Sequence, residues 1–243
     1  MLKLKTVGFI LVVCVLLAVA AGADTNWRGG EGLWRVSGNW DSGVPESGVT
    51  ANIEQPNSVC TIDSDDVGAE AAEAAYINVG ADDGPAVLMI SGGVLLPEYN
   101  MNIGVSAGGD GTLNISAGSI EGVSEIRMAY WAGSVCGRLV MSGGSIECAE
   151  DLITNNEKDS GLSIIELSGG RLDVGGSLEF DRAGSKVDCI MRMEGTAEVN
   201  VVEDVRIGYG NGEETVANFE MDGGELIVGG NLSLGEGPGN GVF

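Results

Sequence analysis

The chain has 243 residues, including 41 glycines but no histidine, and its formal net charge is −24. Glycine makes up about 17% of the chain, more than twice its usual share, but it does not recur at every third position, which excludes collagen. A hydrophobic fraction of 44% argues against wholesale disorder. Because the chain has no histidine, Ser-His and Cys-His nucleophiles and His-ligated metals are excluded. The chain has 12 Lys and Arg against 36 Asp and Glu, and this acidic balance argues against a nucleic-acid partner.

Residues 1–23 have the pattern of a secretory signal peptide. Lys3 and Lys5 charge its start, an uncharged apolar run follows, and Ala21-Gly22-Ala23 supplies the small residues of a cleavage site. The apolar run is shorter than the roughly 20 residues of a membrane-spanning helix, so a retained anchor is the weaker alternative. We therefore expect an exported protein, secreted or on the cell surface, with no membrane contact beyond the signal peptide.

Residues 24–85 are predicted to form an N-terminal cap and a first irregular coil. Trp27, Trp34 and Trp40 lie close together in the chain and supply the bulk that a plug over an open core needs. The alanine-rich stretch Ala69–Ala75 favours a short helical turn. The strand-like segments of this region are 51–53, 60–62 and 76–79.

Residues 86–243 carry a repeated motif of the form apolar-x-apolar-Ser-Gly-Gly. The clearest copies read LMISGG, LNISAG, LVMSGG and IELSGG, and MRMEG and FEMDGG are weaker copies. The last glycine of each copy marks its register. These marks are Gly93, Gly118, Gly144, Gly170, Gly195 and Gly224. Their spacings of 25, 26, 26, 25 and 29 residues define a repeat that fills most of the chain.

Each repeat shows three short segments in which apolar residues alternate with polar ones. In the copy marked by Gly170 these segments are 165–167, 172–174 and 178–180. Alternation with a period of two is typical of strands, and such short strands bury their apolar side only when successive turns stack. The sequence therefore predicts an all-β, right-handed parallel β-helix (a β-solenoid) of about six coils of 25–26 residues with three short strands each. A propeller needs longer repeats, and a sandwich has no reason for a fixed period.

Four cysteines follow the signal peptide, and export permits disulfides between them. Cys148 occupies an apolar position of the repeat, so we expect a small core side chain there. Cys136 and Cys189 lie in equivalent loops two coils apart, roughly 10 Å, which exceeds the reach of a disulfide. The pairing of Cys60 stays open.

The last repeat completes its third strand at Leu234, and the sequence stops where another coil is due, as in a truncated solenoid. An uncovered strand edge invites association. We therefore expect self-association through the open C-terminal coil.

The N-terminal motif W-x-G-G-x-G-x-W…G-N-W-D-S-G-V-P, from Trp27 to Pro45, is followed by a strand and by TID at 61–63. Together with the L-x-I-S-G-G repeats, this pattern resembles bacterial secreted β-strand-repeat proteins. These are the autotransporter-passenger-like and PEP-CTERM-associated repeat proteins of planctomycete type. The resemblance implies a large extracellular or cell-surface protein in which the repeats serve as a stalk or display surface.

Acidic residues recur three positions after four consecutive register marks. They are Glu121, Glu147, Asp173 and Glu198. Stacked coils would place them in one column at roughly 5 Å intervals, as oxygen ligands for Ca²⁺. The alternative is a solvated acidic stripe, and no cofactor is required.

The third strands carry Arg127, Glu179 and Arg206 at outward positions, but no Arg is expected to face this acidic column. A polysaccharide lyase of the β-helix type needs such a base beside its carboxylates. We therefore expect no catalysis.

Tyr130 and Trp131 follow the third strand of the second repeat, in a loop. They are the candidate exposed contact for an extracellular polysaccharide or cell-surface glycan, with the tryptophan-rich cap as the alternative contact. The leading hypothesis is an exported structural or adhesive β-solenoid. A carbohydrate-binding module and, behind it, a Ca²⁺-dependent lyase are the alternatives. For the fold, Leu172→Asp should abolish cooperative melting, whereas Glu179→Gln should change an exposed residue with little effect.

Overall fold

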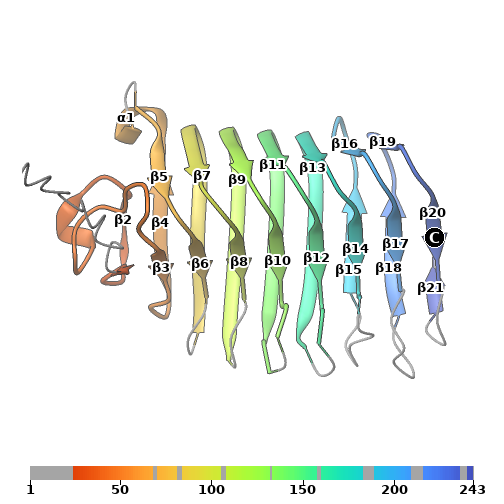
Figure 1. Ribbon diagram of the computed structural model, residues 1–243, viewed down its shortest axis with the longest axis horizontal. Coiled ribbons are helices and arrows are strands. Elements are labelled where there is room, and N and C mark those ends of the chain that lie inside the picture. The colour runs from red at the N-terminus through yellow and green to blue at the C-terminus, as the bar shows by residue number, and fades with distance from the viewer. Residues whose placement is uncertain are drawn as a thin grey trace, which may run out of the picture.

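The computed structural model describes residues 24–67, 70–80, 84–104, 108–131, 133–157, 160–182, 189–208, 216–235 and 240–242. The chain winds into an all-β parallel β-solenoid of about seven turns, which stack along one axis (Figure 1). Every pairing between the named strands is parallel, so each turn lies directly on the previous one. The predicted signal peptide, residues 1–23, lies outside the described residues.

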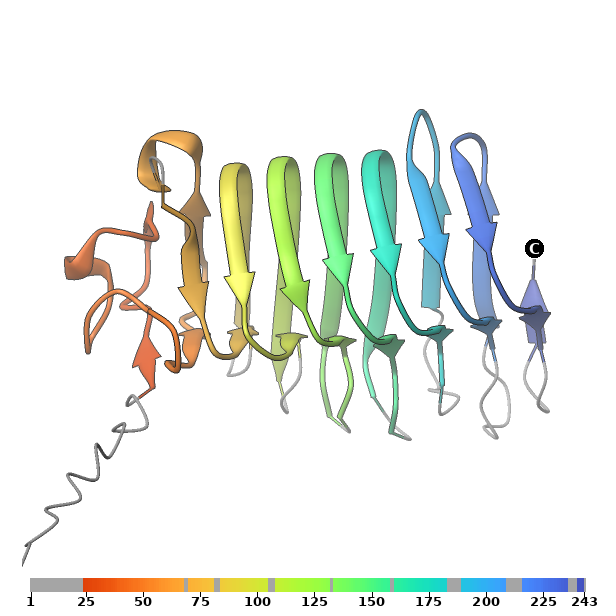
Figure 2. The same cartoon turned by 45° about the horizontal axis from the view of Figure 1, so that its top comes forward.

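One sheet is built from the short strand of each turn, and we call it the short-strand sheet. Its members, in spatial order, are β1 (Thr25–Asn26), β3 (Ala51–Ile53), β6 (Ile77–Val79), β8 (Met101–Ile103), β10 (Ile126–Met128), β12 (Leu152–Thr154), β14 (Leu178–Phe180), β17 (Val205–Ile207) and β20 (Leu232–Leu234). Spatial order follows sequence order, which is what a solenoid requires. The colour gradient along the rod in Figure 2 shows the same order.

The second sheet, which we call the long-strand sheet, carries the remaining strands. They are β2 (Glu31–Leu33), β4 (Ser58–Ile62), β5 (Ala72–Ala74), β7 (Gly84–Pro97), β9 (Gly109–Val123), β11 (Cys136–Cys148), β13 (Leu162–Val174), β15 (Cys189–Met193), β16 (Glu198–Val201), β18 (Val216–Met221), β19 (Glu225–Val228) and β21 (Asn240–Val242). In β7, β9, β11 and β13 the first two predicted strands join into one bent strand, whose register shifts at the Ser-Gly-Gly corner. Later turns keep them separate, as β15 and β16 and as β18 and β19.

The glycines that mark the repeat all have a left-handed backbone, as the sequence predicts for corners. Their φ values are 72° at Gly93, 80° at Gly118, 72° at Gly144, 81° at Gly170, 62° at Gly195 and 78° at Gly224. Space is short there too, because a Cβ on Gly144 would lie 2.6 Å from the carbonyl oxygen of Gly118. Only glycine combines this φ with such a close approach of neighbouring turns.

A second series of left-handed residues ends the short strands, and the sequence repeat did not reveal it. Its φ values are 69° at Gly80, 64° at Gly104, 41° at Ala129, 53° at Asn155, 61° at Asp181, 64° at Gly208 and 67° at Gly235. Three of these residues are not glycine, so no glycine pattern marks the corner. Backbone geometry alone defines it.

The interior of the solenoid is one continuous apolar cluster that runs from Trp27 in the cap to Phe219 in β18. Cys148 lies beside Val174 and is buried, as the sequence predicts. Burial raises the pKa of the Cys148 thiol to about 12, so it behaves as an apolar side chain at neutral pH. Cys60, Cys136, Cys148 and Cys189 are thiols in this structure.

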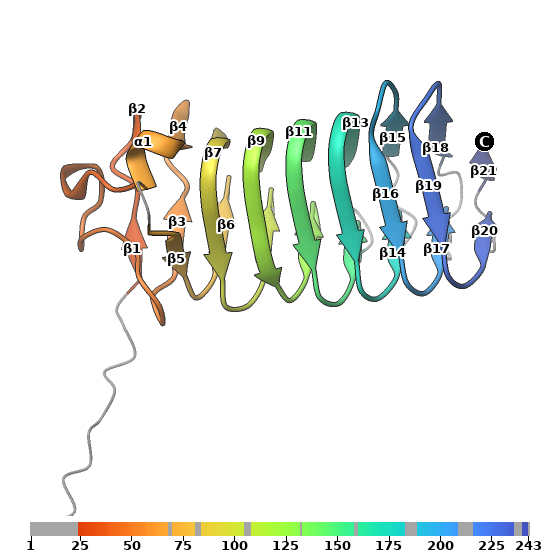
Figure 3. The same ribbon diagram turned by 90° about the horizontal axis from the view of Figure 1, so that it is seen from above.

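Trp27, Trp34 and Trp40 close the N-terminal end of the core, which confirms the predicted plug. Each is at most 1% exposed, and the ring centroids of Trp27 and Trp34 lie 5.0 and 5.1 Å from that of Trp40, edge to face. Figure 3 shows this cap, with β1 and β2, at one end of the rod. The short 3-10 helix η1 (Ser37–Asn39) also belongs to the cap.

The predicted helical turn over Ala69–Ala75 is wrong. Ala72–Ala74 forms β5 and pairs with β7, and the only helical turn nearby in the described chain is α1 (Ser64–Val67). Ala72 and Ala74 are buried, and Glu73 between them is exposed. Burial of alternate residues against the next turn therefore outweighs the local helix preference of alanine.

The last described turn covers its core less than the others do. Leu232 and Leu234 are 45% and 38% exposed, whereas the equivalent Val205 and Ile207 of the preceding turn are at most 1% exposed. No helix among the described residues is long and apolar enough to span a membrane.

Candidate functional site

The four acidic residues proposed to form one column do not all lie in it. Glu147 pairs with Asp173, but the next turn places Asn200 beside Asp173, and Glu198 lies beside Arg171. The inclusion of Glu198 is therefore wrong. Leu167 pairs with Met193 and Arg171 with Glu198, so three residues form one corner and four the next. The glycine mark also lies one residue earlier in the second corner, so the following strand is shifted by two residues relative to its mark.

Glu121 begins the column at an irregular point. It precedes Gly122, which has a φ of 76°, and the register between β9 and β11 shifts there. Its carboxylate accepts a hydrogen bond of 2.8 Å from Ser119. Glu121 therefore meets the column at a bulge rather than in straight register.

An arginine does face the acidic column, contrary to the sequence-based expectation. The Nε atom of Arg171 donates to both oxygens of Asp173 at 2.7 and 3.0 Å, and Nη1 lies 3.8 Å from Glu198. The hydrogen bond with Asp173 raises the pKa of Arg171. No three His, Cys, Asp or Glu side chains in the described part of the chain are grouped to hold a metal ion, so the geometry gives the proposed Ca²⁺ site no support.

Glu179 is not the exposed residue that the sequence suggested. It projects from the outer side of the short-strand sheet, but its side chain is only 9% exposed, because two arginines enclose it. Arg206 donates to it at 2.9 Å, and Arg182 lies 3.1 Å away. Arg206 also bonds Asp204 at 2.8 Å, so this part of the outer face is an ion-pair network.

The outer side of the same sheet carries a ladder of asparagine side chains on four neighbouring strands. Asn52 donates to Asn26 at 3.0 Å, Asn78 to Asn52 at 2.8 Å, and Asn102 to Asn78 at 2.8 Å. The ladder stops at Asn102, whose Oδ1 atom is buried without a hydrogen-bond partner. The recurrence of asparagine at the middle of β3, β6 and β8 is the sequence signal that could have revealed it.

Tyr130 and Trp131, the predicted aromatic contact, lie just beyond β10, with Trp131 exposed and Tyr130 half-buried. Their rings meet edge to face at 5.2 Å, and Trp131 is 38% exposed. Arg127 holds its guanidinium 5.0 Å from the centre of the Tyr130 ring and donates to Glu125 at 2.7 Å. This contact orients the Tyr130 ring toward the outer face of the sheet.

The sequence patterns did not predict a second aromatic pair, which consists of Tyr76 and Tyr99. The two rings stack at 4.8 Å with an angle of 21° between their planes, and both are exposed. Tyr76 comes one residue before β6, but Tyr99 comes two residues before β8, so the repeat register does not align them. Only the stacking of the turns brings them together.

Both aromatic pairs border the same part of the sheet, on the neighbouring strands β6, β8 and β10. We call this surface the aromatic-flanked face. It consists of Tyr76, Asn78, Tyr99, Asn102, Arg127, Tyr130 and Trp131. It combines apolar rings at its borders with polar side chains between them, the composition of a site for a hydroxyl-rich ligand.

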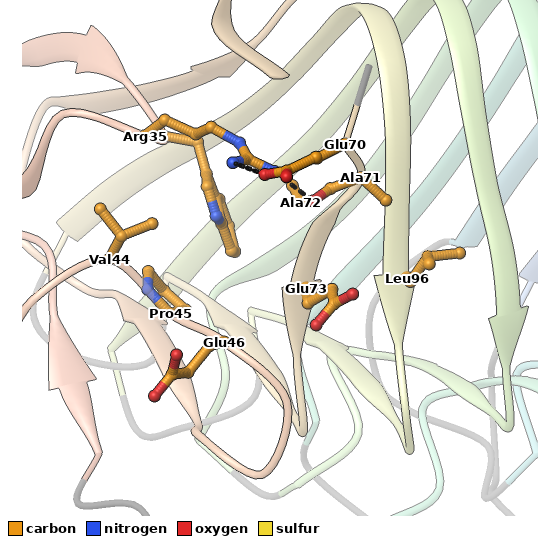
Figure 4. Close-up of a pocket in the computed structure, with 10 residues that line it drawn as sticks. Arg35, Val44, Pro45, Glu46, Glu70, Ala71, Ala72, Glu73 and Leu96 are labelled. Carbon is orange, nitrogen blue, oxygen red and sulfur yellow. Dashed lines mark hydrogen bonds and ion pairs between the residues drawn. The ribbon is translucent and has the colours of Figure 1, made fainter. Parts of the chain in front are cut away.

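A cleft of about 660 Å³ lies between the cap and the first turns (Figure 4). Pro45 and Glu46 lie on one side of it, and Glu73 and Leu96 on the other. Arg35 crosses from the cap and bonds Glu70 at 3.1 Å and the carbonyl oxygen of Ala71 at 2.5 Å. The cleft is therefore bridged by contacts that fasten the cap to the solenoid.

The tryptophans are not a surface for ligands. The Nε1 atom of Trp27 donates to the Gly30 carbonyl oxygen at 3.2 Å, and that of Trp40 to the Trp34 carbonyl oxygen at 2.6 Å. Their rings are buried among themselves, so the alternative glycan contact at the cap is wrong.

No family model matches the chain, and no curated protein or solved structure was found to be similar to it. The described geometry is therefore the only evidence about function. It is that of a parallel β-solenoid with a plugged N-terminal end and a polar outer face bordered by aromatic pairs.

Proposed function

We propose that this protein is an exported structural and adhesive β-solenoid that attaches to extracellular polysaccharide and catalyses no reaction. In this proposal it is a segment of a cell-surface or extracellular protein of the bacterial β-strand-repeat kind. The solenoid fold suits a structural or binding role, because a stack of turns makes a rod with long, regular faces. The single observation that carries the adhesive part is the exposed Trp131, whose ring packs against the half-buried Tyr130.

The chemistry of these rings supports a sugar ligand. Trp131 and Tyr130 offer apolar ring faces together with a polar N–H or O–H, and pyranose rings have apolar C–H faces and polar edges. Arg127 and Glu125, which are held in place by their own ion pair, lie next to Tyr130 and offer both donors and acceptors. A hydroxyl-rich chain can use both kinds of contact at once.

The residues around the acidic column support a role without catalysis. A lyase needs a base that is unprotonated near neutral pH and can accept a proton from its substrate. Arg171, the arginine beside this column, is protonated at neutral pH like any arginine, and its hydrogen bond with Asp173 raises its pKa further. We therefore assign Arg171 to pairing Asp173 and Glu198 rather than to proton transfer.

Affinity electrophoresis in gels that contain a soluble polysaccharide tests the adhesive role. Trp131→Ala should weaken the retardation about 2- to 10-fold, the range expected from the loss of one aromatic contact. Val202→Ala, a change at an exposed apolar residue of a distant turn, is the matched control and should bind like the wild type. If the Trp131 variant and the wild type were retarded equally, the assignment of Trp131 to the polysaccharide contact would be wrong.

A further inference from the structure

We infer that the polysaccharide lies across the whole aromatic-flanked face, from the Tyr130–Trp131 pair to the Tyr76–Tyr99 pair, and that it is an uncharged polysaccharide. The inference rests on the proposed function, because it specifies where the adhesive contact extends and which class of chain it takes. Four observations carry it. They are the placement of the two aromatic pairs, the end of the asparagine ladder, the pairing of Arg127 and the acidic character of the chain.

The two aromatic pairs lie at opposite ends of the same short strands. Tyr76 and Tyr99 precede β6 and β8, and Tyr130 and Trp131 follow β10 beyond the corner at Ala129. Ile77 pairs with Met101, and Met101 pairs with Ile126, so the three strands are consecutive rungs. A short strand with its corner separates the pairs by a distance on the order of 15 Å, the span of an oligosaccharide rather than of a single sugar.

The exposure of the second pair is unusual for this protein. Tyr76 and Tyr99 are 40% and 48% exposed, although aromatic residues are only 5% of the chain. The two rings cover one face of each other by stacking, and both residues remain exposed to solvent. An exposed pair at one border and the exposed Trp131 at the other are the arrangement that a polymer of sugar rings can bridge.

Asn102 marks the point between the pairs where a hydroxyl group can bind. Its residue is 8% exposed, and its Oδ1 atom lacks a donor because the next rung carries Arg127 instead of another asparagine. Arg127 is directed toward Glu125 and Tyr130 instead. A buried acceptor without a partner is costly, and a ligand hydroxyl would satisfy it once the Asn102 side chain turns toward the surface.

The charges on this surface favour an uncharged polysaccharide. Arg127 is the one cation of the aromatic-flanked face as defined here, and Glu125 already neutralises it. Asn78 and Asn102 are neutral, and the chain as a whole carries a charge of −24. A uronate or sulfate chain would therefore meet repulsion without a cation to offset it.

Affinity electrophoresis with four probes tests both parts of the inference. Galactomannan and a mixed-linkage β-glucan are the uncharged probes, and alginate and polygalacturonate are the uronate probes. We expect the wild type to be retarded by at least one uncharged probe and by neither uronate. The double variant Tyr76→Ala/Tyr99→Ala should weaken that binding at least fivefold. The double variant Tyr76→Phe/Tyr99→Phe should keep most of the binding, and the control Val202→Ala should bind like the wild type.

Two measurements keep the test independent of folding. Each variant is first checked for an unchanged melting transition, and the wild type is iodinated with and without the bound probe. The inference expects the probe to protect Tyr76 and Tyr99 from iodination as well as Tyr130. Unprotected Tyr76 and Tyr99 in the complex would overturn it without any substitution.

The failures can be told apart. If Trp131→Ala weakens binding and the Tyr76/Tyr99 alanine variant does not, the adhesive function stands and the extended site is wrong. Tighter binding of alginate or polygalacturonate than of the uncharged probes overturns the assignment of ligand class. If the wild type binds none of the four, the inference and the adhesive function both fail.

Discussion

At the scale of single residues, one carboxylate holds two segments of the cap together. Asp41 accepts hydrogen bonds from the backbone N–H of Asn26 at 2.8 Å and from the Asn26 side chain at 2.7 Å. The backbone hydrogen bond of Asn26 is the main reason why the pKa of Asp41 is lowered from 3.8 to about 2. Because the folded protein favours the ionised form of Asp41, protonation of this carboxylate at acid pH should lower the stability of the cap.

We expect the cap to loosen as the pH falls from about 4 to about 2, since a lowered pKa means that the stabilisation is complete above the unfolded value and is lost on protonation. Tryptophan fluorescence reports the cap selectively, because it contains three of the four tryptophans. Asp41→Asn should shift the unfolding midpoint down at pH 6 and flatten this acid dependence. Asp65→Asn, at an exposed residue of α1, is the control. An unchanged acid profile in the Asp41 variant would contradict the assignment.

The ion pairs of Glu179 lead to a second prediction. Its outward position suggested that Glu179→Gln has little effect on stability, whereas the ion pairs predict a loss of stability. Glu179→Gln should lower the free energy of unfolding by about 1–2 kcal/mol, because Arg206 and Arg182 lose a partner that is largely shielded from water. Glu147→Gln, at an exposed residue, should stay within about 0.5 kcal/mol of the wild type. Urea unfolding of both variants decides between the two positions, and equal midpoints would refute the network.

At the scale of the elements, the corner lengths determine which residues become neighbours. Strands of three to five residues alternate reliably, so the inward side chains of β13 and β14 were predictable. The corners that precede Arg171 and Glu198 differ in length by one residue. This difference was not predictable, because glycine marks do not show which corner residue faces inward. The same limit hid the Tyr76–Tyr99 stack, whose members lie at different distances from their strands.

The inward columns of β11, β13 and β16 provide the test at this scale. Leu172, fully buried between Ile146 and Val199, cannot hold a charge without losing the contacts of three turns. Leu172→Asp should therefore abolish cooperative thermal unfolding. Val202→Asp, at a residue that is 66% exposed, should leave it intact. A cooperative transition near the wild-type temperature in the Leu172 variant would argue against a continuous core.

At the scale of the whole molecule, the two ends of the rod differ in how they cover the core. The cap buries the first turn under three tryptophans, whereas the last described turn leaves Leu232 and Leu234 partly open to solvent. Exposed apolar side chains beside an edge strand favour association with another β surface. Self-association through this turn stays a prediction.

Sedimentation velocity over a range of concentrations checks it. The 243-residue chain should show a concentration-dependent increase in sedimentation coefficient, and Leu232→Lys/Leu234→Lys should keep it monomeric. Val36→Lys adds the same kind of charge at an exposed position of the cap, at the other end of the rod, and should associate like the wild type. A wild type that remains monomeric at every concentration would rule this association out.

The sequence by itself determined the solenoid, the corner glycines, the tryptophan plug and the exposed Trp131. Each follows from a property of residues close together in the chain, such as alternation, left-handed φ or bulk. The tertiary structure alone decided the partners of Glu198, the burial of Glu179, the end of the asparagine ladder at Asn102 and the stacking of Tyr76 on Tyr99. These depend on how one turn rests on the next, and a single residue more or less in a corner changes that register without altering the local pattern.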